Sequence, residues 1–90
     1  MYKISFSNKF KKDYKLCKKR GCDISKLEEV IILLQENGKL PPKYKAHMLK
    51  GHYEGLWECH IKPDWLLVWL QDNQELTLLL TNTGTHSDLF

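Results

Sequence analysis

Residues 57–70, WECHIKPDWLLVWL, predict two strands of a sheet joined by a tight turn. From Leu56 to Ile61 apolar and polar residues alternate, which is typical of a strand with one buried face. The alternation places Cys59 on the buried side and His60 on the opposite side. Residues 62–64 predict the turn, because proline cannot donate a hydrogen bond to a sheet and aspartate favours turn positions.

The second of these strands is apolar throughout. Residues 65–70, WLLVWL, show no polar alternation, as expected for a strand that is covered on both faces. After a hairpin turn at residues 72–73, another strand is predicted from Glu75 to Thr81. Its inward residues are expected to be Leu76, Leu78 and Leu80.

Upstream of this region, the sequence predicts one short strand and a basic helix. Residues 2–6 alternate as a strand does, and Ser7 is a suitable N-cap for a helix over residues 8–20. Lysines and one arginine fill most of the helix surface, and Gly21 suits its C-terminal end. The apolar stripe of this helix consists of Phe10, Tyr14 and Cys17.

A second helix is predicted from a capping-box pattern, in which Ser25 is followed three residues later by Glu28. The helix ends at Gly38, and its buried stripe is expected to contain Leu27, Val30, Ile31 and Leu34. Residues 40–42, Leu-Pro-Pro, cannot continue a helix and predict an extended crossover. Residues 43–55 resemble an exposed loop or extended segment.

The resulting order β-α-α-β-β-β predicts an α+β fold, with two helices packed on one face of a small, mostly antiparallel sheet. The length of 90 residues suffices for one hydrophobic core, and with no repeat or linker we expect residues 1–90 to form a single domain. The three cysteines lack a paired C-x-x-C spacing, so we expect reduced thiols rather than a disulfide or metal framework.

Charge and hydropathy limit the classes of function. No apolar run approaches the ~20 residues of a membrane helix, and no signal peptide is evident, so we expect a cytoplasmic protein without a membrane partner. The net charge is +3, but nine of the fourteen lysines and arginines lie in residues 1–26. Such a basic end suits a nucleic acid or an acidic protein, and it equally suits a solvated helix face.

Histidines and one aspartate are the candidate reactive groups. The sequence contains His47, His52, His60 and His86, with Asp64 close to the third of them. Two kinds of chemistry fit: metal binding, for which no H-E-x-x-H or similar close pair is present, and metal-free acid–base chemistry on a phosphodiester. We favour the second, because an imidazole can donate or accept a proton near neutral pH.

RNA suits this chemistry because its 2′-hydroxyl becomes a nucleophile once a base removes its proton. A ribonuclease also needs positive charge beside the phosphate, for which Lys62 is a candidate. Trp65 and Phe90 are candidates for stacking on the bases of the RNA. Trp65 fits a core position at the start of a strand nearly as well.

Two motifs resemble a known family. HIKPDWLL at residues 60–67 and TGTHSDLF at residues 83–90 are similar to the YafQ branch of the RelE/ParE superfamily, the toxins of bacterial type II toxin–antitoxin pairs. The resemblance extends to the basic helix and to PPKYKAHMLKG at residues 41–51, and so covers essentially the whole chain. It implies a RelE-like fold, a ribosome-dependent endoribonuclease that cuts translated mRNA in the decoding site, contact with ribosomal RNA, and a cognate antitoxin that holds the enzyme inactive.

The resemblance also assigns residues. The functional positions of the family fall on His47, His60, Asp64, Trp65, His86 and Phe90 of this sequence, and His52 matches none of them. Our hypothesis makes His86 the general acid, Asp64 or His60 the base or its orienting partner, and His47 and Lys62 phosphate contacts, with no metal or other cofactor. The sequence alone does not decide which of these residues is the acid and which is the base.

One departure and two alternatives stand beside this interpretation. Members of the family often carry Tyr-Arg where this chain has Leu56-Trp57-Glu58, and a missing arginine would weaken a phosphate or antitoxin contact. The first alternative is a ParE-like toxin that inhibits DNA gyrase without nuclease activity. The second is an inactive RNA- or antitoxin-binding module. The histidine and aspartate set favours the nuclease, because an inhibitor that acts by binding does not need it.

Overall fold

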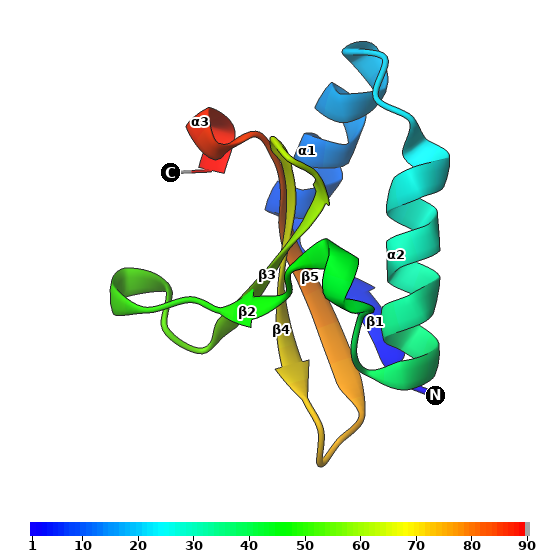
Figure 1. The fold of residues 1–90 in the computed structure, drawn as a ribbon, viewed down its shortest axis with the longest axis vertical. Helices are drawn as coiled ribbons and strands as arrows, with labels where there is room; N and C mark the ends of the chain where they lie inside the picture. The colour runs from blue at the N-terminus through cyan, green and yellow to red at the C-terminus, as the bar shows by residue number, and fades with distance from the viewer. Residues whose placement is uncertain (90) are drawn as a thin grey trace.

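A computed structural model describes residues 1–89, which form a five-stranded sheet and two long helices (Figure 1). The elements in chain order are β1 (Lys3–Phe6), α1 (Asn8–Lys19), α2 (Ile24–Asn37), the 3-10 turn η1 (Pro42–Tyr44), β2 (His47–Met48), the 3-10 turn η2 (Gly51–Tyr53), β3 (Leu56–Lys62), β4 (Trp65–Asp72), β5 (Thr77–Gly84) and α3 (His86–Leu89). The sheet order is β1-β5-β4-β3-β2, in which β1 and β5 are parallel and the other pairs antiparallel. The predicted α+β class and the order of its elements are confirmed, and the structure adds the two-residue strand β2 and the short C-terminal helix α3.

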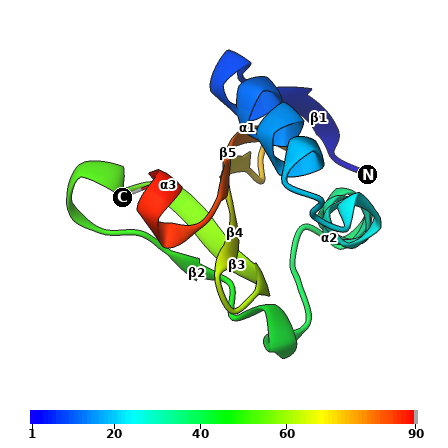
Figure 2. The same cartoon turned by 90° about the horizontal axis from the view of Figure 1, so that it is seen from above.

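The sheet separates two layers. Helices α1 and α2 cover one face, while α3 and the loop after β2 lie on the other side (Figure 2). On the helix side, Trp57 and Trp69 stand opposite each other on β3 and β4 and stack with ring centroids 6.2 Å apart. The core on this side consists of Phe10, Cys17, Leu27, Val30, Leu34, Tyr44, Cys59, Trp65, Leu67, Trp69, Leu78 and Leu80.

Helix α1 completes the edge of β5 where the short strand β1 ends. β1 pairs with residues 77–80 of β5, so the next backbone groups of β5 lack a strand partner on that side. Ser7 Oγ donates to the carbonyl oxygen of Thr81, and a carboxylate oxygen of Asp13 accepts from the backbone N–H of Thr83 at 3.1 Å. Both Asp13 and Thr83 are buried, which fixes α1 against the end of β5.

The helix boundaries follow from their capping residues. Ser7 caps α1 as predicted, because its hydroxyl accepts from the N–H of Phe10. The predicted cap of α2 at Ser25 is wrong: the helix begins at Ile24, and the Asp23 carboxylate accepts from the N–H of Ser25. Gly38 ends α2 with a φ of 69°, as its position predicted. Over residues 1–89, no helix is both long and apolar enough to cross a membrane.

Three details of the strand region differ from prediction. After Pro41 the chain forms the turn η1 instead of continuing as an extended crossover. Residues 65–69 are buried on both faces, but Leu70 is 46% exposed because the β4–β5 hairpin projects beyond the covering segments (Figure 1). Leu76 is exposed rather than inward, because the turn that Asp72 stabilises continues through it, with a φ of 54°.

Candidate active site

The candidate site lies on the sheet face opposite the two long helices. Residues that stand opposite each other in adjacent strands share a face of the sheet. His47 stands opposite Glu58, which in turn stands opposite Val68, and His60 stands opposite Leu66. The four strand residues Glu58, His60, Leu66 and Val68 therefore form a floor on which His47 is placed by β2.

Three histidines form a row on this floor. The ring centroids of His47 and His60 are 6.4 Å apart, and those of His60 and His86 are 5.8 Å apart. His60 is the most buried of the three side chains, at 24% exposed, against about half for the other two. The row thus brings together residues from β2, β3 and α3.

Glu58 lies beneath two of these rings and is 5% exposed. Its Oε1 is 3.3 Å from Nε2 of His47 and 4.0 Å from Nε2 of His60. The other ring nitrogens, Nδ1, face the carbonyl oxygens of Lys45 and Pro63 at 2.9 and 3.3 Å. Because a carbonyl only accepts, each Nδ1 acts as the donor, which leaves the lone pair of each neutral ring on Nε2.

Glu58 is a functional residue that the sequence analysis did not single out. Its position two residues before His60 in a strand put the two side chains on one face, which was the available signal. A buried carboxylate at the base of two imidazoles stabilises whichever ring gains a proton. We therefore add Glu58 to the candidate site.

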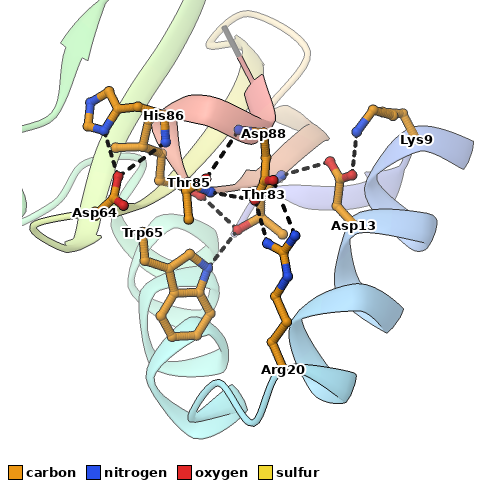
Figure 3. Close-up of polar contacts among 10 residues, drawn as sticks. Lys9, Asp13, Arg20, Asp64, Trp65, Thr83, Thr85, His86 and Asp88 are labelled. Carbon is orange, nitrogen blue, oxygen red and sulfur yellow. Dashed lines mark hydrogen bonds and ion pairs between the residues drawn. The ribbon is translucent and has the colours of Figure 1, made fainter.

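Asp64 and His86 form the second half of the site (Figure 3). Oδ1 of Asp64 accepts from Nδ1 of His86 at 3.0 Å and from the backbone N–H of the same residue at 3.2 Å. These contacts, the side-chain hydrogen bond first, hold the pKa of Asp64 below its ordinary value. With Nδ1 bound to the carboxylate, Nε2 is the ring atom that can exchange a proton with a substrate.

The remaining predicted residues do not join this row. Lys62 is exposed and lines a cavity of about 460 Å³ together with Asp23 and Asp64. Trp65 is 6% exposed, belongs to the core and donates from Nε1 to Thr83 Oγ1 at 3.0 Å, so it does not provide an exposed stacking surface. The turn η2 holds His52 in an exposed position. Phe90 lies outside the described residues.

Two of the three thiols are buried away from the row of histidines. Burial raises the pKa of Cys59 to about 12 and that of Cys17 to about 11, with Cys22 contributing to the second shift, so both thiols stay protonated near neutral pH. Within residues 1–89, no group of three or more histidine, cysteine, aspartate or glutamate side chains is arranged to hold a metal ion. What the row offers chemically is proton transfer and positive charge.

Comparison with known proteins identifies the class. The chain is 39% identical over 88 residues to the mRNA interferase toxin YafQ of Escherichia coli strain K12, which covers 97% of this chain and 94% of that protein. The E. coli DinJ–YafQ complex contains a chain with a TM-score of 0.90 and 37% identity, over 100% of this chain and 99% of that one. A metal-bound toxin from Helicobacter pylori has a TM-score of 0.90 and 47% identity, over 100% of both chains.

These similarities define a small toxin of a type II toxin–antitoxin system. The family described as bacterial toxin of type II toxin-antitoxin system, YafQ, matches residues 2–90, and the chain belongs to this family. The resemblance inferred from the two sequence motifs is thereby confirmed, and so is the RelE-like fold that it implied. The two curated relatives from Escherichia coli carry the name mRNA interferase toxin.

Proposed function

We propose that this chain is a cytoplasmic mRNA interferase, which cleaves translated mRNA in the ribosomal decoding site and is held inactive by a cognate antitoxin. The curated E. coli relatives carry the name mRNA interferase toxin. The observation that carries the proposal is the hydrogen-bonded pair of the Asp64 carboxylate and the His86 ring. The His86 ring lies next to the ring of His60 on the same face of the sheet. Such a pair is an acid–base device suited to a phosphodiester.

In the proposed reaction, the 2′-hydroxyl oxygen forms a bond to phosphorus while the bond from phosphorus to the 5′ oxygen breaks. A base removes the proton of the 2′-hydroxyl, and an acid supplies a proton to the leaving 5′ oxygen. We assign the acid to Nε2 of His86, since Nδ1 of that ring is engaged with Asp64. Asp64 has a lowered pKa and is a weak base, so we assign it to orienting His86.

The base in this scheme is His60. Its Nδ1 faces the carbonyl oxygen of Pro63, which favours the tautomer that leaves Nε2 able to accept a proton. The positive charge that the ring gains is balanced by Glu58 below it. We assign to His47, at the β2 end of the row, contact with a phosphate oxygen.

The experiment that tests this scheme maps transcript ends after induction of the toxin in growing cells. We expect His86→Ala to lower cleavage within codons by roughly 100-fold or more, the range for loss of a general acid. His52→Ala serves as the control, because that exposed histidine lies in η2 outside the row. Full cleavage by the His86 variant contradicts the assignment, and growth arrest by the wild type without transcript cuts contradicts the proposed activity.

The basic helix α1 is proposed to serve two partners. Its exposed lysines, among them Lys12 and Lys19, suit ribosomal RNA. Between α1 and α2 lies an apolar cavity of about 710 Å³, lined by Phe6, Phe10, Tyr14, Ile31 and Ile32 and bordered by Lys11, Lys15, Lys18 and Glu28. An amphipathic antitoxin helix with acidic flanks matches both the apolar floor and the basic border.

A binding measurement with the purified antitoxin tests the proposed groove. We expect Ile32→Glu to weaken antitoxin binding at least about tenfold, because it places a charge on the apolar floor. Ile32 is half exposed, so the fold should tolerate the change. Unchanged affinity in this variant means that the antitoxin binds elsewhere.

A further inference from the structure

Arg20, just beyond α1, makes an ion pair with a residue of the short helix that carries His86. Nη1 of Arg20 lies 2.7 Å from Oδ2 of Asp88, and Nη2 lies 3.4 Å from Oδ1 of the same carboxylate (Figure 3). The two residues are 68 positions apart in the sequence. The pair therefore connects the C-terminal end of the basic helix to α3 across the end of the sheet.

Asp88 also organises the start of α3. Its Oδ2 accepts from the backbone N–H of Thr85 at 3.0 Å, and the Thr85 hydroxyl accepts from the N–H of Asp88 at 3.1 Å. This reciprocal arrangement is a capping box with aspartate as its acidic member. One carboxylate thus caps the helix and binds Arg20 at the same time. The Arg20 hydrogen bond, followed by the Thr85 N–H, lowers the pKa of Asp88 to about 2.

Gly84 allows Asp88 to lie close against the backbone at the end of β5. A side chain at Gly84 would meet the Asp88 carboxylate at 3.0 Å, and Gly84 has a φ of 153°. The turn from β5 into α3 thus brings Asp88 directly over the strand end, while the next N–H, that of His86, donates to Asp64. The position of the His86 ring depends on the docking of this one helical turn.

We propose that Arg20 is a positioning residue for His86: by holding Asp88, it docks α3 and keeps the His86 ring beside Asp64 and His60. A four-residue helix is too short to be stable alone, so its docking must come from tertiary contacts. Arg20 supplies a charge-assisted contact of two nitrogens with one carboxylate, which fixes orientation as well as distance. The expected effect on catalysis rests on the proposed nuclease function. The docking of α3 by Arg20 does not depend on that function.

The test compares Arg20→Met with Arg20→Lys and with Lys39→Met. Lys39 is exposed beyond α2, so the control removes one positive charge away from the site. Two quantities are measured for each variant: the pKa of the Asp64 carboxyl by NMR, and kcat and KM for cleavage of mRNA on ribosomes. An unfolding curve for each variant shows that the core is intact.

For Arg20→Met we expect the Asp64 pKa to rise toward its ordinary value, because the His86 hydrogen bonds that lower it are populated less. We expect kcat to fall roughly two- to fivefold, the range that exposed ion pairs support, with a smaller loss in Arg20→Lys, which keeps the charge but not the two-nitrogen geometry. Lys39→Met should change neither quantity.

Two results overturn the proposal: an unchanged Asp64 pKa in Arg20→Met, or equal effects in Arg20→Met and Lys39→Met. A fall in kcat without any change in the Asp64 pKa assigns Arg20 to direct RNA contact instead, and also overturns it. If the wild-type protein does not cleave mRNA, the proposed function fails, yet the Asp64 pKa still decides whether Arg20 positions His86.

Discussion

Replacing Asp13 with alanine tests how α1 is fixed to the sheet. The carboxylate accepts from the backbone N–H of Thr83, which is 2% exposed and lies beyond the end of β1. In Asp13→Ala this N–H is buried without its acceptor, at a cost of about 1–3 kcal/mol. For a domain of this size, about 2 kcal/mol lowers the midpoint of thermal unfolding by roughly 8–16 °C. Thermal unfolding followed by circular dichroism measures this shift.

Asp13→Asn is the matched variant for this experiment. It keeps a side-chain oxygen that accepts from Thr83 but loses the charge that pairs with Lys9, a half-exposed partner. Exposed ion pairs contribute about 0–1 kcal/mol, so we expect a loss of less than about half that of Asp13→Ala. A fall of under about 2 °C in Asp13→Ala would mean that water satisfies the N–H and that the reasoning is wrong.

Three further predictions concern the site, the core and α3. Glu58→Gln should lower kcat for mRNA cleavage by about tenfold or more and leave KM close to that of wild type. The reason is that the buried carboxylate balances the charge of a protonated ring in the transition state. Equal kcat values for the variant and the wild type contradict the inclusion of Glu58 in the site. Leu67→Ala should cost about 2–5 kcal/mol in urea unfolding, since Leu67 is fully buried, and Leu70→Ala, on the exposed part of the same strand, should cost less than about 1 kcal/mol. On acidification, α3 should undock, because the pKa of Asp88 is lowered from its ordinary value of 3.8 to about 2 in the folded protein. The stabilising contribution of this carboxylate is complete above pH 3.8 and is lost as the pH falls through 2, and NMR signals of α3 report the loss. Undocking that is already complete at pH 5 contradicts the assigned cause.

Strand and helix periodicity carried most of the fold prediction. The alternation around Cys59 and His60 assigned the two faces of β3 correctly. The apolar stripe of α2 predicted its three buried residues, and it also included Ile31, which is only partly buried. The errors lie at positions where two local structures are both compatible with the sequence. Asp23 and Ser25 are both good N-caps, and periodicity does not choose between them. Leu76 is apolar and in phase with β5, but Asp72 holds it in a turn.

The site was predictable to the extent that its residues end strands. His60 and Asp64 flank one turn, and the pairing of β4 with β5 brings His86 to it, so strand order alone implied their meeting. Orientation was not predictable in the same way. Between His60 and Lys62 the register of β3 shifts, which breaks the alternation that would keep both side chains on one face. The sequence offered both a core and a stacking position for Trp65, and the hydrogen bond from its Nε1 to Thr83 accompanies the core position.

The parallel pairing of β1 with β5 has a consequence for synthesis of the chain. The Ser7 hydroxyl donates a hydrogen bond to the carbonyl oxygen of Thr81, 74 positions later in the sequence. Strand β1 is therefore synthesised first but cannot pair until β5 has been synthesised. The entropy cost of closing so long a loop comes before the stabilising contacts form, and this slows folding. The segment bearing His86 follows β5 directly. The histidine row and the sheet beneath it can therefore assemble only after nearly the whole chain has been made.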